Sequence, residues 1–383
     1  MRRSFYRLDR SGLSLILDQL KHRGYTVLGP KACGNALQWR PLDCLEDLPG
    51  GLSTLLAPAQ YRLQTGSETC LFGNPGGLDS IKAILHPPRQ TITTIRKAGD
   101  QLEISQETPP AAKLAFVGIQ SCDLAAVAAL DRVLLQNGEA DEVYSANRAN
   151  AFFLSVHCTQ SGPTCFCASM GTGPRAKAGF DIALTERLEG EQPEYLAEAG
   201  SSLGAKVLEE AHALPAPPEW MRQSTEATQK AAEAQTRKVN RQAARAVIDS
   251  TFEHPRWEQT AKRCLSCGNC TSACPTCFCV NYEEQSSLDL ASAQRVRLWD
   301  SCFTLSFSYI HGGSIRLTPK SRFRQWVSHK LARWQDQFGV TGCVGCGRCI
   351  VWCPAAIDIT EEFAVLEQAA GSAVTAGGSP HGH

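Results

Sequence analysis

Two cysteine-rich runs in the C-terminal third of the chain have the residue types and spacing to bind metal clusters. They are Cys264-Leu-Ser-Cys267-Gly-Asn-Cys270-Thr-Ser-Ala-Cys274-Pro and Cys343-Val-Gly-Cys346-Gly-Arg-Cys349-Ile-Val-Trp-Cys353-Pro. Both follow the pattern C-x₂-C-x₂-C-x₃-C-P, in which three thiolates bind one 4Fe–4S cluster and the fourth binds the neighbouring cluster. The sequence therefore predicts a module with two 4Fe–4S clusters.

The crossed pattern divides these eight cysteines into two predicted ligand sets. The first cluster is predicted to be bound by Cys264, Cys267, Cys270 and Cys353. The second is predicted to be bound by Cys343, Cys346, Cys349 and Cys274. Zinc or purely structural thiols are the less favoured interpretation, because zinc sites usually pair two C-x₂-C knuckles without a third in-line cysteine.

A parallel strand–helix–strand unit is predicted in the middle of the chain. Residues 114–119 and 151–156 are short apolar runs, and an alanine-rich helix from residue 121 to about residue 135 lies between them. Two such strands separated by a helix indicate a βαβ unit. Open α/β sheets place their ligands beyond the carboxyl ends of the strands. The residues that follow each strand are therefore candidates for a site.

Four further cysteines follow these two strands. Cys122 comes after the first strand, Cys158 after the second, and Cys165 and Cys167 form a C-x-C group a few residues later. If the βαβ unit forms, the four thiols converge at one edge of the sheet, which is enough for a third 4Fe–4S cluster. The C-x-C spacing is less specific than the two longer runs, so zinc and unligated or redox-active thiols remain alternatives.

Another group, Cys277, Cys279 and Cys302, offers only three thiolates. These cysteines are candidates either to line the two-cluster site or to bind a cluster that has a non-cysteine fourth ligand. The competing interpretation is that they are small buried residues beside the cluster sulfides. Three cysteines have no partner at ligand spacing and are interpreted as ordinary core residues: Cys33, Cys44 and Cys70.

Composition excludes several classes of function. The 383-residue chain has a formal net charge of zero, which argues against binding to nucleic acid or to an anionic membrane surface. No apolar stretch approaches the length of a transmembrane helix. Eighteen cysteines, mostly in short ligand-like groups, indicate metal binding in a reducing compartment rather than a disulfide framework. We therefore expect a cytoplasmic protein.

The expected fold class is α+β with several domains. An N-terminal α/β domain is expected to precede a C-terminal α-helical, ferredoxin-like dicluster domain, and residues 223–248 are expected to form one long helix. The expected boundaries are 1–215 for the N-terminal domain with its candidate third cluster, 216–255 for a helical linker, 256–370 for the dicluster domain and 371–383 for a disordered tail.

The chain lacks recognisable catalytic and nucleotide-binding signals. The best glycine-rich candidate, Gly171-Thr-Gly173-Pro-Arg-Ala176, follows the C-x-C group rather than a strand, and Pro174 fits a pyrophosphate-binding helix start poorly. No paired C-x₂-C motifs near the two termini could bind nickel and iron. We therefore expect no catalytic residues, and neither flavin nor NAD bound by this chain.

As an ordered series, the motifs between about residues 110 and 360 resemble the beta subunit of the cytoplasmic NAD(P)-linked nickel–iron hydrogenases, also called sulfhydrogenases. The motifs are Gly118-Ile-Gln-Ser-Cys122-Asp-Leu, Cys165-Phe-Cys167, Cys274-Pro-Thr-Cys277-Phe-Cys279, Trp299-Asp-Ser-Cys302, His311-Gly-Gly, Arg322-Phe-Arg, His329-Lys330 and Cys343-Val-Gly-Cys346-Gly-Arg-Cys349. The series is also similar to the iron–sulfur electron-transfer subunit of anaerobic sulfite reductase, and the first hundred residues match only loosely.

The resemblance implies a non-catalytic electron-transfer subunit of an oxidoreductase complex. Its implied partners are a flavin subunit that binds NAD(P)H and a nickel–iron hydrogenase module with a small and a large subunit. Three alternatives stay open at this point. They are an electron-transfer subunit of anaerobic sulfite reductase, a zinc-stabilised scaffold subunit, and an enzyme with its own flavin.

Overall fold

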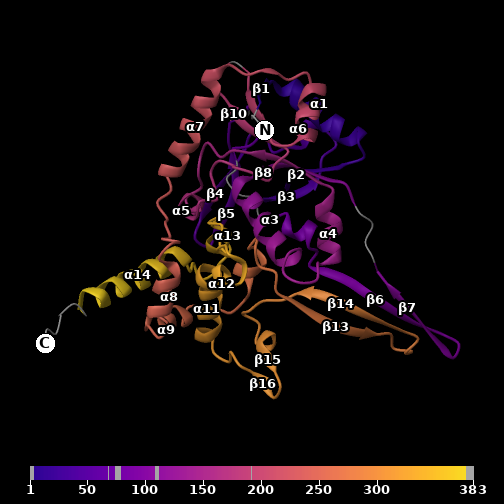
Figure 1. Ribbon diagram of the computed structural model, residues 1–383, viewed down its shortest axis with the longest axis vertical. Coiled ribbons are helices and arrows are strands. Elements are labelled where there is room, and N and C mark those ends of the chain that lie inside the picture. Colours follow the sequence, from indigo (N-terminus) through magenta and orange to yellow (C-terminus); the bar gives the residue numbers. More distant parts are fainter. Residues whose placement is uncertain (1–3, 68, 74–78, 108–111, 191, 377–383) are drawn as a thin grey trace.

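The computed structural model describes residues 4–67, 69–73, 79–107, 112–190 and 192–376. Its largest element is an eight-stranded mixed sheet in the N-terminal half (Figure 1). In spatial order, the strands are β12 (Leu214–Pro215), β1 (Phe5–Leu8), β11 (Glu194–Ala199), β10 (Ile182–Arg187), β9 (Ala151–Val156), β8 (Leu114–Gln120), β2 (Thr26–Cys33) and β3 (Ala36–Pro41).

The central strands of this sheet run parallel. β10 pairs with β9, β9 with β8 and β8 with β2, all in parallel register. The connection from β8 to β9 passes through α3 (Ser121–Leu134) and α4 (Glu142–Ala149). The predicted βαβ unit is therefore present, and the ends of β8 and β9 lie at the same edge of the sheet.

Helices cover both faces of the sheet, which explains why its central strands are apolar throughout. On one face, α1 (Arg10–His22) and α6 (Ser202–Glu210) pack their leucine, isoleucine and valine side chains against the strands. On the other face, α2 (Lys82–Leu85), α3 and α4 do the same around Phe116 and Phe153.

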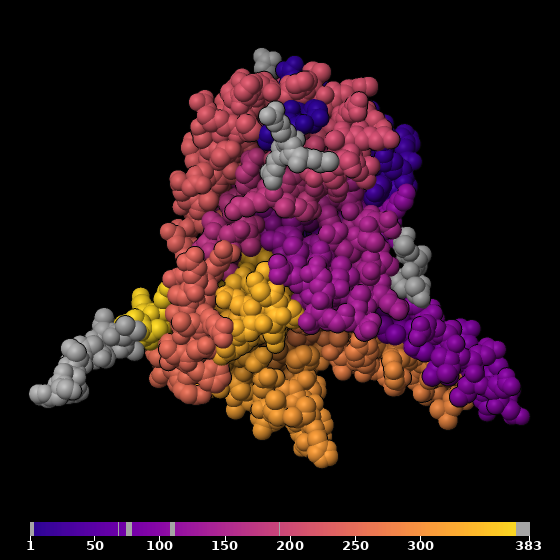
Figure 2. All heavy atoms as spheres, viewed as in Figure 1, coloured from indigo at the N-terminus to yellow at the C-terminus, as the bar shows by residue number. Residues whose placement is uncertain are grey.

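A second, four-stranded antiparallel sheet forms an arm that projects from the body of the molecule (Figures 1 and 2). Its strands, in spatial order, are β13 (Val280–Ser286), β14 (Ser292–Trp299), β6 (Arg89–Ala98) and β7 (Gln101–Gln106). The expectation of a purely helical dicluster region is wrong here, because this region contains the β13–β14 hairpin. β14 pairs directly with β6, so the expected boundary at residue 215 does not separate the chain into two sequential units.

The remaining strands form two small hairpins, β4 (Leu52–Ala57) with β5 (Gln60–Thr65) and β15 (Tyr309–Ile310) with β16 (Gly313–Ser314). The C-terminal helices share a core that contains Trp257, Phe323, Trp326 and Phe363. The helices of this region are α8 (Ala244–Ser250), α9 (Arg256–Ala261), α10 (Asn269–Ser272), α11 (Pro319–Ser328), a π-helical turn (His329–Arg333), α12 (Trp334–Phe338), α13 (Arg348–Val351) and α14 (Ile359–Ala376).

Two helical expectations are corrected by the structure. The long helix expected over residues 223–248 is divided into α7 (Pro218–Glu233) and α8. Between them the backbone amide of Val239 donates to Ser169 Oγ at 3.1 Å rather than to a carbonyl one helical turn earlier. The tail expected to be disordered from residue 371 is helical as far as residue 376, while residues 377–383 lie outside the described residues. Within the described part of the chain, no helix is both long and apolar enough to cross a membrane.

Candidate metal centres

The first predicted ligand set lines one small cavity in the C-terminal helical core. Cys264 and Cys267 reach it from the loop that leads into α10, Cys270 from α10 itself, and Cys353 from just beyond α13. The structure therefore brings together the four cysteines that the crossed pattern assigns to one cluster. Cys349 of the second set also lines this cavity. Four cysteine thiolates are the donor set of a 4Fe–4S cluster. The apolar wall of the cavity is formed by Phe303, Phe323, Trp326 and Ile357.

Backbone amides point at the sulfur atoms of both runs. The amide of Ser266 donates to Cys264 Sγ at 3.4 Å, and the amide of Ile357 donates to Cys353 Sγ at 3.3 Å. In the second run the amide of Gly345 donates to Cys343 Sγ at 3.4 Å. Hydrogen bonds of this kind stabilise negative charge on the sulfur and are one of the means by which proteins set cluster potentials.

The second predicted ligand set also converges. Burial raises the pKa of the Cys349 thiol, and the neighbouring thiols of Cys343, Cys346 and Cys274 raise it further. Cys270 of the first set acts on Cys349 in the same direction, so thiols of both runs face Cys349. A hydrogen-bonded contact links Cys274 to the second run: Thr276 Oγ1 lies 3.2 Å from Cys274 Sγ and donates to the carbonyl of Gly342, next to Cys343, at 2.6 Å. Like-charged thiolates that gather in a buried site favour a positively charged metal centre, which stabilises their deprotonated form. The donor set thus fits a second cluster.

The third group of cysteines converges at the carboxyl edge of the large sheet. Cys122 lies in the first turn of α3 directly after β8, Cys158 follows β9, and Cys167 begins α5 (Cys167–Met170). Burial raises the pKa of the Cys158 thiol, and the thiols of Cys167 and Cys165 act in the same direction. Burial and the charge of Asp123 raise the pKa of the Cys122 thiol, and Cys167 adds to the rise. Cys122 and Cys158 therefore both lie near Cys167, and Cys165 lies near Cys158.

The loop of the third group packs directly on the loop of the second set. The amide of Phe166 donates to the carbonyl of Gly345 at 2.8 Å, and Thr172 Oγ1 donates to the carbonyl of Val344 at 2.6 Å. Gly347 has a φ of +75°, and a Cβ atom there would lie 2.3 Å from the carbonyl oxygen of Thr164. A side chain at Gly347 would therefore prevent this close approach. Cys122, Cys167 and Cys346 belong to one buried contact cluster as a result.

A buried ion pair joins the same two loops. Both guanidinium Nη atoms of Arg348 contact the carboxylate oxygens of Asp123, each at 2.8 Å. The two residues are only 4% and 3% exposed. Bidentate pairs of this geometry fix orientation as well as charge. The sequence pattern shows Asp123 and Arg348 only as neighbours of cysteines, 225 residues apart, and does not predict that they meet.

Gln235 is a further residue that the sequence does not reveal. It is 4% exposed, and its Nε2 donates to Cys167 Sγ at 3.3 Å while its Oε1 accepts from the amide of Ala168 at 2.9 Å. The side chain thus holds the start of α5 in place and directs a donor at one of the candidate ligands. No local sequence pattern marks this position.

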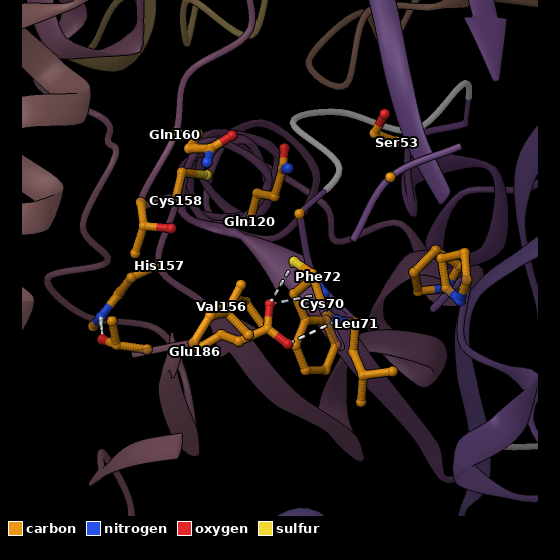
Figure 3. A pocket seen from close by; sticks show the side chains of 18 of the residues that line it. Ser53, Cys70, Leu71, Phe72, Gln120, Val156, His157, Cys158, Gln160 and Glu186 are labelled. Atoms are coloured by element: carbon orange, nitrogen blue, oxygen red, sulfur yellow. Dashed lines mark hydrogen bonds between the residues drawn. The ribbon is translucent and has the colours of Figure 1, made fainter. Parts of the chain in front are cut away.

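A cavity of about 490 Å³ borders the third group (Figure 3). Cys158 and Gln160 lie on one side of it, and the Cys70–Phe72 segment lies on another. Glu186 holds that segment by accepting from Cys70 Sγ at 3.0 Å and from the amides of Leu71 and Phe72 at 2.7 and 3.1 Å. Burial and the Glu186 charge raise the pKa of Cys70 to about 12, so this thiol stays protonated at neutral pH.

The three additional cysteines lie against the first two ligand sets rather than apart from them. The Cys277 thiol hydrogen-bonds to Cys274. Cys302 lies near two other thiols: burial and then Cys302 raise the pKa of Cys270, and burial and then Cys279 raise the pKa of Cys302.

Within the described residues, no three or more His, Cys, Asp or Glu side chains are placed to bind a single metal ion.

Comparison with known proteins agrees with this geometry. Residues 263–357 match the family model of the 4Fe–4S dicluster domain, which contains both cysteine runs. The chain is thus an iron–sulfur protein with a two-cluster module.

The chain is also similar to a protein that is named as a sulfhydrogenase subunit. It is 34% identical over 287 residues to the Sulfhydrogenase 2 subunit beta of Pyrococcus furiosus, and the alignment covers 73% of this chain and 82% of that protein. The chain therefore belongs to the family of sulfhydrogenase beta subunits, which confirms the resemblance seen in the ordered motifs. No solved structure matches it.

Proposed function

We propose that this chain relays electrons between a flavin subunit that binds NAD(P)H and a nickel–iron hydrogenase module. The observation that supports the proposal is that the three cysteine groups lie next to one another in the folded chain. When bound, 4Fe–4S clusters supply reversible one-electron transfer at potentials that the surrounding protein sets. Cys122, Cys158, Cys165 and Cys167 are proposed to hold the third cluster of the series.

The order of the groups supports a relay. Cys346 of the second set lies in one buried contact cluster with Cys122 and Cys167 of the third group. On its other side, Cys349 lines the same cavity as the first ligand set. The second set therefore lies between the other two. The third group borders the large cavity, and Cys267 of the first set is exposed, so each end of the series is accessible from a different part of the surface.

The partners follow from the family. The similar protein is named as the beta subunit of a sulfhydrogenase, so its name describes one component of an assembly. We extend this to the present chain and infer that it contacts the small and large nickel–iron subunits and a separate flavin subunit in the cytoplasm. The chain itself is proposed to bind neither flavin nor NAD, and its cysteines, rather than catalytic residues, perform its function.

The purified chain is expected to accept electrons without catalysing a reaction. Anaerobically purified protein should absorb broadly near roughly 400 nm, and dithionite should bleach this absorbance, because 4Fe–4S clusters are coloured and reducible. The same preparation should neither oxidise NADH or NADPH nor consume or evolve hydrogen. A colourless zinc-containing protein, or pyridine-nucleotide oxidation by the single chain with extractable flavin, would contradict the proposal.

A further inference from the structure

Two lysine side chains are buried beside the second ligand set without forming an ion pair. Lys82 is 2% exposed and Lys330 is 3% exposed. Among the described residues, no carboxylate pairs with either ammonium group, although Arg348 and Arg237 in the same region have buried carboxylate partners. Burying an ammonium group without an anion costs several kcal/mol. A buried lysine therefore either loses its proton or needs a negative charge, which no paired Asp or Glu supplies to these two among the described residues.

The hydroxyl group of Thr276 lies between the Lys330 ammonium group and the proposed cluster ligand Cys274. It extends from the π-helical turn, and its Nζ donates to Thr276 Oγ1 at 2.7 Å. The same hydroxyl oxygen lies 3.2 Å from Cys274 Sγ. The carbonyl of Lys330 also accepts from the amide of Gly342 at 2.8 Å, next to the start of the second cysteine run. Lys330 is thus fixed at both its backbone and its side chain.

Lys82 comes from the opposite end of the sequence and lines a cavity with Cys267 of the first set as well as with Cys277 and Cys279. It belongs to α2 and its Nζ donates to the carbonyl of Cys277 at 3.0 Å, across 195 residues. The ammonium also lies 3.8 Å from the centre of the Trp299 ring. A carbonyl and an aromatic face hold a cation in position but do not neutralise it.

Cysteine thiols face both ammonium groups, and Asp300 lines a cavity together with Lys82. Burial lowers the pKa of Lys82, and the charges of Cys277 and Cys274 oppose that shift. Burial also acts to lower the pKa of Lys330, but the charges of Cys274 and Cys277 outweigh it and raise that pKa. Of these thiols, Cys274 belongs to the second ligand set. A 4Fe–4S cluster with four thiolate ligands is anionic, and it gains one further negative charge when it is reduced. The residues at this position therefore fit an anionic centre.

The surroundings of the other two groups differ. The cavity of the first set is lined by its own cysteines, by Cys349 and by aromatic and aliphatic side chains, and no lysine or arginine is among its described lining residues. One buried arginine lies near it: Arg322 is 8% exposed, and its Nη2 donates to Ser266 Oγ at 3.3 Å, two residues after Cys264. Beside the third group, the charge of Arg348 faces the carboxylate of Asp123. The central position thus differs from the first in having two buried lysines rather than a single arginine.

We propose that Lys82 and Lys330 raise the reduction potential of the cluster bound by Cys274, Cys343, Cys346 and Cys349 above the potentials of the other two clusters. The proposal rests on the proposed function for the presence of the clusters. Its physical basis is that a fixed positive charge in a low-dielectric interior stabilises the added electron more than it would in water. The lysines thereby make the central position the place where an electron resides between its arrival and its departure.

The test is a redox titration of the anaerobically purified full chain, monitored by electron paramagnetic resonance. In the wild-type protein, the second cluster should be reduced first. Lys330→Met and Lys82→Met should each lower the equilibrium constant for its reduction by roughly tenfold or more, which corresponds to about 59 mV for one electron. Lys330→Arg and Lys82→Arg keep the charge and should largely preserve the wild-type potential.

An exposed lysine provides the matched control. Lys206 lies on α6, on the far side of the large sheet from the second set, and Lys206→Met should move none of the potentials.

The inference is wrong if another cluster is reduced first in the wild-type protein, or if the methionine variants retain their iron and their potentials. Iron analysis separates the two proposals: absence of clusters from the wild-type chain contradicts the proposed function, whereas unchanged potentials in cluster-loaded variants contradict this inference alone. Should Lys330→Met lose iron, the wild-type reduction order and Lys82→Met decide the question.

Discussion

Replacing Asp123 with alanine is expected to lower the free energy of unfolding by about 3–5 kcal/mol, because breaking a buried ion pair leaves the opposite charge without its partner carboxylate. Both nitrogens that Arg348 directs at Asp123 would lose their 2.8 Å contacts. The third cysteine group would also lose a rigid link to the second cysteine run. Chemical denaturation of the anaerobic protein measures the change.

A surface ion pair and a double variant provide the controls. Glu284 and Arg295 form a contact of 2.6 Å between two side chains that are each 57% exposed. Glu284→Ala should therefore cost no more than about 1 kcal/mol. The double variant Asp123→Leu/Arg348→Met removes both charges and should recover part of the stability. If Asp123→Ala costs no more than Glu284→Ala, the buried pair does not have the structural importance assigned to it.

Substitution of Cys274 by serine is expected to disturb the cluster that is remote in sequence. Cys274 lies within the first cysteine run, yet the structure places it with Cys343, Cys346 and Cys349. Cys274→Ser should therefore alter or abolish the spectroscopic signals of the second cluster and leave those of the first unchanged. Electron paramagnetic resonance of the reduced protein distinguishes the two clusters.

The mirror-image variant provides a matched control. Cys353 lies within the second cysteine run but lines the cavity of the first ligand set. Cys353→Ser should accordingly disturb the first cluster and spare the second. The crossed arrangement is refuted if each substitution affects only the cluster whose other ligands are nearest in sequence.

Local patterns are sufficient to predict the parts of the site that depend on strand ends and loop spacing. The apolar runs of β8 and β9 predict two parallel strands, and their shared edge places both Cys122 and Cys158 near Cys167. The spacing of the two long cysteine runs similarly predicts the cavity that Cys353 shares with the first run. In each case, geometry that is fixed within a few residues determines where the thiols lie.

Contacts between distant segments could not be predicted in this way. β6 pairs with β14 although nothing in either strand specifies its partner, and this pairing joins the expected N-terminal and C-terminal domains. Lys82 and Arg348 likewise acquire their positions only from tertiary packing, across 195 and 225 residues. A single charged residue in a loop or short helix is normally solvated, so the sequence gives no reason to place either one beside a cluster.

The most direct test of the account is the iron and sulfide content of the anaerobically purified full chain. The full chain is needed because β6 and β7 of the N-terminal half pair within a sheet that includes β13 and β14. Three 4Fe–4S clusters predict about twelve irons per wild-type chain. Replacing Cys122, Cys158, Cys165 and Cys167 together by serine should reduce this to about eight. A wild-type chain with only about eight irons, unchanged by the fourfold substitution, would show that the third group binds no cluster and that the proposed three-cluster relay is wrong.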